Sequence, residues 1–177
     1  MLPQPAADDA PLIAAARAGE SAAFEQLFER YYAVIHAFAY RLCGRSEDAD
    51  DLAQETFVKV GRGLAGYRGG DFRSWIYRIA ANGARDLHRD NLRRARLERE
   101  AAEQALAENA TRPADVGPIE EALAALPLEY RTAVVLVYFE GLNHAQAAQV
   151  LRCAEATVSW RLFRAKRQLK TALSTSR

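Results

Sequence analysis

The apolar residues of this 177-residue chain recur at three- and four-residue steps instead of alternating with polar residues. Such a step keeps them on one face of an α-helix, whereas a half-buried strand needs a period of two. Glycine and proline separate the helical segments, and no segment reads as a strand bounded by turns. The sequence therefore predicts an all-α fold, and its 50% hydrophobic content is sufficient for a sizeable core.

The helical segments form two groups, separated by a stretch rich in alanine and acidic residues. Helices are expected at about 12–18, 21–43, 47–64 and from 71 onward in the first group, and at about 119–126 and 128–140 in the second. Ser21 is a candidate N-cap of the long second helix, and Gly44 is its expected end. The separating stretch, "REAAEQALAENATRPADVG" (residues 99–117), has few large apolar residues, so it is predicted to be a linker.

The clearest local signal lies in "GLNHAQAAQVLRCAEATVSWRLFRAKRQLKTAL", residues 141–173. Asn143 and Gln146 have capping-box spacing, a two-turn helix follows to Leu151, and a second helix begins after a break at 152–154. This is helix-turn-helix spacing. Short side chains at the start of the second helix would let it enter a DNA major groove, with the arginines on phosphates. Generic paired helices show the same periodicity, so a purely structural helix pair stays open as the alternative.

A second stretch, "DFRSWIYRIAANGARDLHRD" (residues 71–90), joins an apolar stripe to a basic surface. Asp71 is placed to cap the helix, and the stripe consists of Phe72, Trp75, Ile76, Ile79, Ala80 and Gly83. The basic residues that follow are Arg85, Arg89, Arg93, Arg94, Arg96 and Arg99. Their concentrated positive potential favours an anionic partner, and the alternative is an ordinary solvated helix face.

Charge alternates along the chain although the total is only +1. The net charge is −4 over residues 1–67, +4 over 68–100, −5 over 101–141 and +6 over 142–177. Such alternation is awkward for a single catalytic cleft. It suits a protein that touches a polyanion at two places and another protein elsewhere.

Cysteine and histidine usage argues against an enzyme or a metal protein. Cys43 and Cys153 lie far apart and lack C-x-x-C spacing, and without a secretory signal they suggest free thiols in a reducing cytoplasm. His36, His88 and His144 are scattered, and no glycine-rich phosphate loop is present. The longest apolar runs are too short for a transmembrane segment. We therefore expect a cytoplasmic protein without catalytic residues, metal, cofactor or small-molecule substrate.

Five motifs in order give the chain a family resemblance. They are "AFEQLFERYY", "DADDLAQETFVKV", "FRSWIYRIAANGARD", "LPLEYRTAVVL", and "GLNHAQAAQVL" with "ATVSWRLFRAKRQL". Over about residues 20–173 the chain resembles a bacterial sigma factor of the extracytoplasmic-function (ECF) group, the smallest members of the sigma-70 family. The resemblance implies a region 2 domain (1–98), a flexible linker (99–117) and a region 4 domain (118–177) with the helix-turn-helix.

The resemblance also implies partners and binding residues. A sigma factor of this kind binds core RNA polymerase, at the clamp helices of its largest subunit and at its flap, and directs promoter-specific transcription initiation; an anti-sigma factor is a further partner. The core-binding residues would be Asp48, Asp51, Gln54 and Glu55. Those for the promoter −10 element would be Tyr67, Arg68, Gly69, Arg73, Tyr77, Arg78, Asn82 and Arg85. Those for the −35 element would be Glu155, Thr157, Ser159, Trp160, Arg161, Arg164 and Lys166.

The loop "GYRGGD", residues 66–71, has a particular expected task. A base extruded from the opening −10 element must stack or hydrogen-bond somewhere, and this loop beside Tyr67, Phe72 and Trp75 would supply the pocket. For Trp75, as for Ile76 and Ile79, helical periodicity favours the core instead.

Several residues depart from the family pattern. Near the end of the third helix Gly61 stands where the family commonly has a tryptophan, and Gly63 follows just after it. Two interior glycines each cost about 1 kcal/mol relative to alanine. Arg152 replaces a small turn residue, Ala154 a capping serine, and Trp160 a frequent serine.

Two other functions remain as alternatives. A helix-turn-helix transcriptional regulator acting without core polymerase would need no acidic clamp-binding helix and would usually dimerise. A protein-interaction module would not need two separated basic faces.

Overall fold

The computed structural model describes residues 9–102 and 117–175, and every element within these ranges is helical. In chain order they are α1 (Ala10–Arg17), α2 (Ser21–Cys43), α3 (Ser46–Gly63), the 3-10 turn η1 (Leu64–Gly66), α4 (Phe72–Ala102), α5 (Pro118–Ala124), α6 (Leu128–Val134), the π-helical segment η2 (Val135–Phe139), α7 (His144–Leu151) and α8 (Glu155–Thr175). The predicted all-α fold is confirmed. Helix α4 continues to Ala102, into the stretch predicted as linker, and residues 103–116 lie outside the described ranges.

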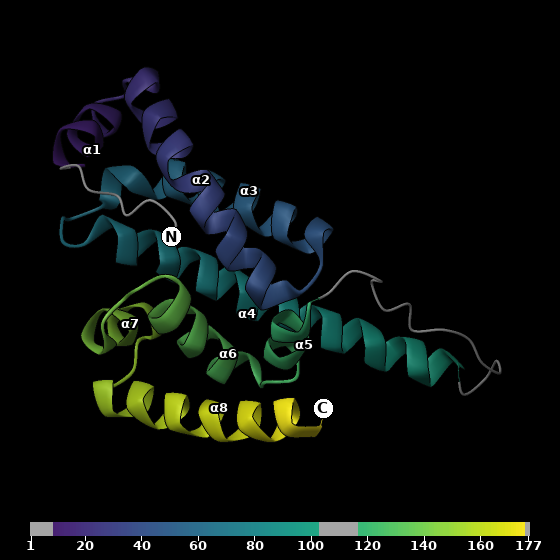
Figure 1. Ribbon diagram of the computed structural model, residues 1–177. Coiled ribbons are helices and arrows are strands. Elements are labelled where there is room, and N and C mark those ends of the chain that lie inside the picture. Colours follow the sequence, from purple (N-terminus) through teal and green to yellow (C-terminus); the bar gives the residue numbers. More distant parts are fainter. Residues whose placement is uncertain (1–8, 103–116, 176–177) are drawn as a thin grey trace.

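Helices α1 to α4 form the N-terminal half, in which α2 packs against α1, α3 and α4 (Figure 1). Gly44 ends α2 as expected, because at φ 75° it adopts the left-handed conformation and its N–H donates to the Tyr40 carbonyl at 2.8 Å. The expected N-cap was wrong. Ser21 is already the first helical residue, and extended Glu20 precedes it without a side-chain capping bond.

Glycines set the spacing between α3 and its neighbours. A Cβ atom on Gly83 of α4 would lie 2.6 Å from Leu52 Cδ1 of α3, so the buried Leu52 side chain would have to shift to make room for any side chain at this position. A Cβ on Gly63 would meet the Trp75 ring at 3.3 Å, and one on Gly61 would meet the Phe24 ring at 3.4 Å. The two glycines that depart from the family pattern are therefore contact positions for aromatic rings.

The C-terminal half, α5 to α8, contains the predicted helix-turn-helix. The capping box is confirmed: the Gln146 N–H donates to Asn143 Oδ1 at 2.8 Å, and Asn143 N–H donates to Gln146 Oε1 at 3.0 Å. Arg152 ends α7 with φ 52° and ψ 49°, the only non-glycine residue with positive φ in the described ranges. The turn thus places a large side chain where glycine is unstrained.

The segment expected as one helix over 128–140 changes type part-way. After α6 it continues as the π-helical η2, where the Glu140 N–H donates to the Val135 carbonyl at 2.9 Å. A π turn holds an additional residue and changes the direction of the side chains that follow it. Glu140 is 3% exposed and lies inside the molecule at the end of this turn, before Gly141 reverses the chain at φ 68°.

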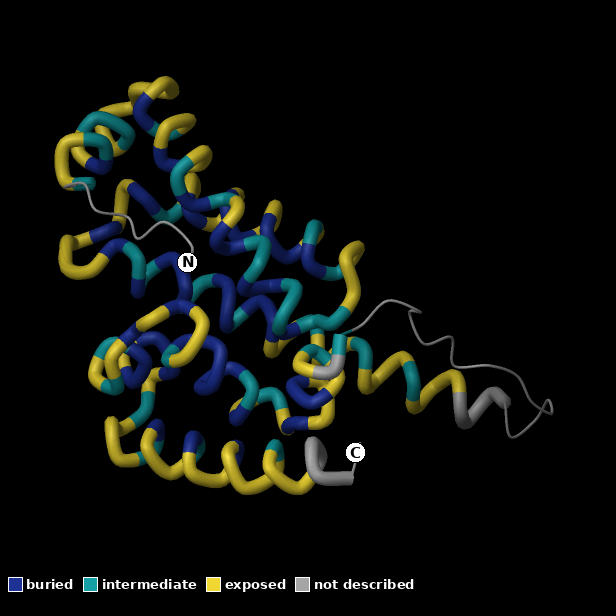
Figure 2. Tube along the Cα trace, in the orientation of Figure 1, coloured by how far each residue is buried: buried dark blue, intermediate teal, exposed yellow. Residues whose placement is uncertain are grey.

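The two halves share a continuous core. Helix α7 packs against α4, and α5 and α6 pack against α2, while α8 covers the opposite side of α5, α6 and α7 (Figure 1). Buried segments continue from α2 and α4 into α6 and α7, whereas the outer face of α8 is exposed (Figure 2). The C-terminal half therefore lies against α4 on one side and presents α8 on the other.

Candidate nucleic-acid interface

An acidic face covers one side of α3 and consists of Asp48, Asp51, Gln54 and Glu55. Three of these residues are exposed, namely Asp51, Gln54 and Glu55, and Asp48 is half-buried. This face points to solvent because the buried stripe of α3 packs against α2 and α4. Glu55 pairs with Lys59 one turn later at 2.9 Å, an exposed contact of small energetic weight. The four residues predicted together are thus neighbours on one helix face.

Beside Asp48 lies the Cys43 thiol at the end of α2. Burial, followed by the nearby Asp48 carboxylate, raises the pKa of Cys43 to about 12. The thiol is therefore protonated at neutral pH and unreactive.

The loop before α4 is stabilised by a hydrogen bond from its own tyrosine. Tyr67 is buried and its hydroxyl donates to the Gly70 carbonyl at 2.7 Å. Gly69 and Gly70 have φ of 92° and 98°, which only glycine adopts readily. Asp71 then caps α4 as predicted, accepting from the Arg73 N–H at 3.2 Å and from the Ser74 hydroxyl at 2.6 Å.

A pocket of about 310 Å³ lies against this loop. Its walls come from residues 66–71, Ser74, Trp75 and Arg78, and from Gln149 of α7. Phe72 does not line it, contrary to expectation, because that ring is 4% exposed and packs edge-on against Tyr31 and Tyr67 in the core. Gln149 had no distinguishing signal in the sequence.

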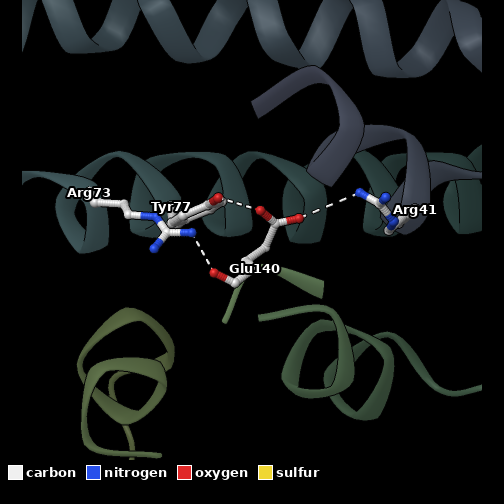
Figure 3. A network of polar contacts seen from close by, with 4 residues as sticks. All are labelled: Arg41, Arg73, Tyr77 and Glu140. Atoms are coloured by element: carbon white, nitrogen blue, oxygen red, sulfur yellow. Dashed lines mark hydrogen bonds and ion pairs between the residues drawn. The ribbon is translucent and has the colours of Figure 1, made fainter. Parts of the chain in front are cut away.

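Two residues predicted for the −10 element, Arg73 and Tyr77, point into the contact between the halves (Figure 3). Tyr77 is 1% exposed and its hydroxyl donates to Glu140 Oε2. The Arg73 guanidinium donates to the Glu140 backbone carbonyl, and Arg41 of α2 lies 3.5 Å from Glu140 Oε1. These four residues are called the Glu140 network below. Sequence reasoning did not identify Glu140, whose only local signal is an acid directly after an apolar run.

Burial controls the protonation of this network. It raises the pKa of the Glu140 carboxyl, although the hydrogen bond from Tyr77 and the positive charges of Arg41 and Arg73 act in the opposite direction. Burial and the neighbouring Glu140 carboxylate raise the pKa of Tyr77 as well. Tyr77 is therefore a neutral donor at any physiological pH.

The other residues predicted for the −10 element lie around this contact. Arg68, Gly69 and Arg85 are exposed, and Arg78 and Asn82 are half-buried. Of the three residues assigned to the core, Ile76 is fully buried, and Trp75 and Ile79 pack against the core with partial exposure, which confirms that reading. Helix α4 thus divides into one face in the core, one against α7, and a basic remainder.

The outer face of α8 carries the residues predicted for the −35 element. Glu155, Ser159, Trp160, Arg164 and Lys166 are exposed, and Thr157 and Arg161 are half-buried. The opposite stripe of Val158, Leu162, Ala165 and Leu169 packs inward, as predicted.

Two aromatic contacts and an ion pair fix this outer face. The Trp160 ring meets Tyr130 edge-on at 5.7 Å between centroids, and the Arg164 guanidinium lies 5.8 Å from the Trp160 ring centre. Arg161 pairs with Glu129 of α6 at 3.2 Å, so its charge is partly neutralised within the protein. Arg164 is the freer cation for a phosphate.

Two of the three histidines have ordinary polar partners. His36 lies 2.8 Å from Asp50, and His144 Nδ1 lies 3.0 Å from the Ser159 hydroxyl, which joins α7 to α8. Within residues 9–102 and 117–175 no three metal-ligating side chains come together. No helix in these ranges combines the length and apolar character needed to cross a bilayer.

Comparison with known proteins decides the family. The sigma-70 region 2 family matches residues 27–94, and the sigma-70 region 4 family matches residues 117–169. The ECF RNA polymerase sigma factor SigM of Mycobacterium tuberculosis is 37% identical over 169 residues, covering 93% of this chain and 84% of SigM. The chain belongs to the ECF group of the sigma-70 family. Another relative of this sigma factor, the RNA polymerase sigma-H factor of Pseudomonas aeruginosa, is 31% identical and covers 93% of each chain.

Two solved structures share the fold. CnrH, in complex with the cytosolic domain of CnrY, has a TM-score of 0.73 at 32% identity, covering 96% of this chain and 99% of CnrH. The sigma factor RpoE of Bartonella quintana, in complex with the anti-sigma factor NepR, has a TM-score of 0.65 at 25% identity, covering 87% of this chain and 98% of RpoE. The region 2 match covers α3 with most of α2 and α4, and the region 4 match covers α5 to α7 with most of α8. The N-terminal half, α1–α4, is called the region 2 domain below, and the C-terminal half, α5–α8, the region 4 domain.

Proposed function

We propose that this ECF sigma factor initiates transcription through three separate surfaces. The acidic face of α3 binds core RNA polymerase, α4 with its preceding loop captures the −10 element, and α8 reads the −35 element. The single observation that carries this division is the separation of charge in the fold, with acid on α3 and exposed cations on α4 and α8.

Support for core binding comes from the exposed carboxylates of α3. Asp51 and Glu55 are one turn apart on the same face and neither is buried by another element. A carboxylate face of this kind complements a basic helical partner such as the polymerase clamp helices, and such complementarity accelerates association and selects the partner.

Support for −10 capture comes from the pocket beside the loop. Its walls combine backbone polar groups of 66–71, the Trp75 ring and the Arg78 guanidinium. Those are the groups that stack on an unstacked base and hold its phosphate. Exposed Arg85 would continue the phosphate track along α4.

Support for −35 readout comes from the position of α8 as the second helix of the helix-turn-helix. Exposed Glu155 and Ser159 stand near its N-terminal end, where such helices meet base edges in the major groove. Arg164 and Lys166 are exposed farther along, at positions suited to phosphates.

A further pocket of about 450 Å³, almost wholly apolar, lies between α6, η2 and α8. It is lined by Val134, Tyr138, Leu162, Lys166, Leu169 and Lys170. We propose it as the docking site of the region 4 domain for the polymerase flap. The solved complex of the sigma factor RpoE with the anti-sigma factor NepR supports an anti-sigma factor as a further partner of this chain. In this proposal the protein is a cytoplasmic initiation factor without enzymatic activity or small-molecule substrate.

Run-off transcription with purified core polymerase, on the gene's own upstream region, tests the function. Wild-type protein should give a discrete transcript. The Asp51→Ala/Glu55→Ala variant should bind core polymerase more weakly, so a higher concentration of it should be needed for the same amount of transcript. The matched control is Glu25→Ala/Glu29→Ala, which removes the same charge from exposed positions one turn apart on α2. A protein that binds DNA as a specific dimer, yet never associates with core, would favour the alternative helix-turn-helix regulator.

A further inference from the structure

The outward side of α8 begins with apolar side chains and continues with charged ones. Ala156, Trp160 and Phe163 recur there at four- and three-residue steps, and Arg164 and Arg167 follow. Both aromatic rings are exposed, and side chains three residues apart are neighbours on a helix surface. They form an apolar patch in water, which is the kind of surface that marks a binding site.

The Trp160 ring is held in place although it is 51% exposed. Buried Tyr130 of α6 meets it edge-on, with 5.7 Å between the ring centroids. The Arg164 guanidinium lies 5.8 Å from its ring centre. A side chain that is already ordered loses little conformational entropy on binding, so Trp160 is a preorganised contact.

The charges around the patch favour duplex DNA over a protein as its partner. The Arg167 guanidinium lies 5.9 Å from the Phe163 ring centre, so each of the two exposed rings has an arginine beside it. Within α8 the only acidic residue is Glu155, at its first position. Cations interleaved with apolar rings complement a polyanion that also presents apolar groups.

The chemistry of the indole ring favours one base. Trp160 lies in the second turn of α8, and the N-terminal part of such a helix meets base edges in the major groove. An indole has one N–H donor and no acceptor. Thymine presents an apolar methyl group in that groove, whereas cytosine presents an amino donor. Covering this donor with a ring that cannot accept from it would leave it without a hydrogen bond, which costs free energy.

We propose that Trp160 is a specificity-determining residue of this sigma factor: its indole ring covers the C5 methyl group of a thymine in the −35 element and selects thymine against cytosine. The inference rests on the proposed role of α8 in reading that element, and it names the base that is read. A serine at this position, frequent in the family, would offer a hydroxyl and no apolar face. The preference is therefore a property of the tryptophan in this chain.

Replacement of single thymines by deoxyuridine tests the inference, because it removes the methyl group and keeps every hydrogen-bonding atom of the base. Full-length protein is titrated by fluorescence anisotropy against labelled duplexes that carry the −35 element of the gene's own promoter, each with one replacement. For the wild type one replacement should weaken binding about three- to fourfold, the value of one buried methyl group. Trp160→Ser should bind the unmodified duplex more weakly and should no longer respond to that replacement. Trp160→Phe keeps an apolar ring and should retain part of the response.

Ile119→Ser is the matched control, because it removes a similarly exposed apolar side chain from α5 and should keep the wild-type pattern. A Trp160→Ser protein with the full wild-type response to the missing methyl group overturns the inference. A wild type that responds to no replacement overturns it as well and assigns the ring to a protein partner. In both cases the role of α8 in −35 binding stands. Wild-type protein that binds no −35 duplex, free or with core polymerase, overturns that proposed role instead.

Discussion

Helix α4 of the region 2 domain and helix α8 of the region 4 domain both carry exposed arginines, yet they are packed in different ways. Helix α4 is packed against α2 and α3 on one side and α7 on another, whereas α8 contacts α5, α6 and α7 and leaves most of its outer face in solvent. Duplex DNA can meet a preformed outer face directly. Under the proposed function the −10 strand instead enters the pocket beside residues 66–71, whose wall includes Gln149 of α7.

The largest expected effect tests how tightly α4 is embedded. Gly83→Val should destabilise the region 2 domain by about 3 kcal/mol, because its side chain would overlap Leu52 in a buried contact. Ala156→Val on the exposed start of α8 should change stability by about 0.5 kcal/mol or less. Urea unfolding of both variants measures the contrast. Equal losses would mean that the two helices are embedded to the same degree.

A smaller effect separates the two DNA surfaces by function. Arg161→Ala/Arg164→Ala should weaken binding to duplex −35 DNA about tenfold, or about 1.4 kcal/mol, with a salt dependence shallower by about one to two phosphate contacts. Arg164→Ala should account for most of this, because Arg161 already pairs with Glu129. Anisotropy titrations at several salt concentrations provide the measurement.

A premelted promoter bubble extends this comparison. It should rescue transcription by the Arg161/Arg164 variant but not by Asn82→Ala or by a protein with a shortened 66–71 loop. Full rescue of the loop variant would assign that loop to melting rather than base capture, and rescue of neither would show that region 2 does not read the −10 strand.

The next largest effect is expected in the turn between α7 and α8. Arg152→Gly should stabilise the region 4 domain by about 1 kcal/mol, because glycine adopts φ 52° without a Cβ penalty. The midpoint of thermal or urea unfolding should rise, while Arg152→Val should lower it. An Arg152→Gly protein that is less stable would show that the arginine makes compensating contacts.

The smallest expected effect concerns the pH dependence of the Glu140 network, which lies between the two halves. Burial raises the pKa of the Glu140 carboxyl above its ordinary value of 4.5. The stability of the folded protein that depends on a protonated Glu140 is therefore fully present below pH 4.5 and is lost as pH rises through the folded pKa. Glu140→Gln keeps an acceptor for Tyr77 and removes the charge. Its stability relative to wild type should therefore increase as pH rises above 4.5, as measured by unfolding at a series of pH values. A parallel course for both proteins would contradict the assignment.

Local signals predicted much of the fold and part of the site. The Asn143–Gln146 capping box, the Gly44 helix end and the Asp71 cap each depend on groups within a few residues, so sequence spacing was sufficient. Ser21 failed because a cap depends on where the first turn begins, which packing shifts by a residue. The prediction that Phe72 lies beside the loop pocket failed because helical periodicity does not show which apolar ring lines a pocket and which enters the core.

By itself the sequence determined the all-α class, the helix-turn-helix, the order of acidic and basic segments and the family, because all of these reside in spacing and composition along the chain. Only the tertiary structure decided that Gln149 joins the loop pocket, and that Arg73 and Tyr77 meet Glu140, more than sixty residues away. The physical reason is that the desolvation of a buried charge depends on every element packed around it. Those elements come from two domains whose mutual placement leaves no period in the sequence.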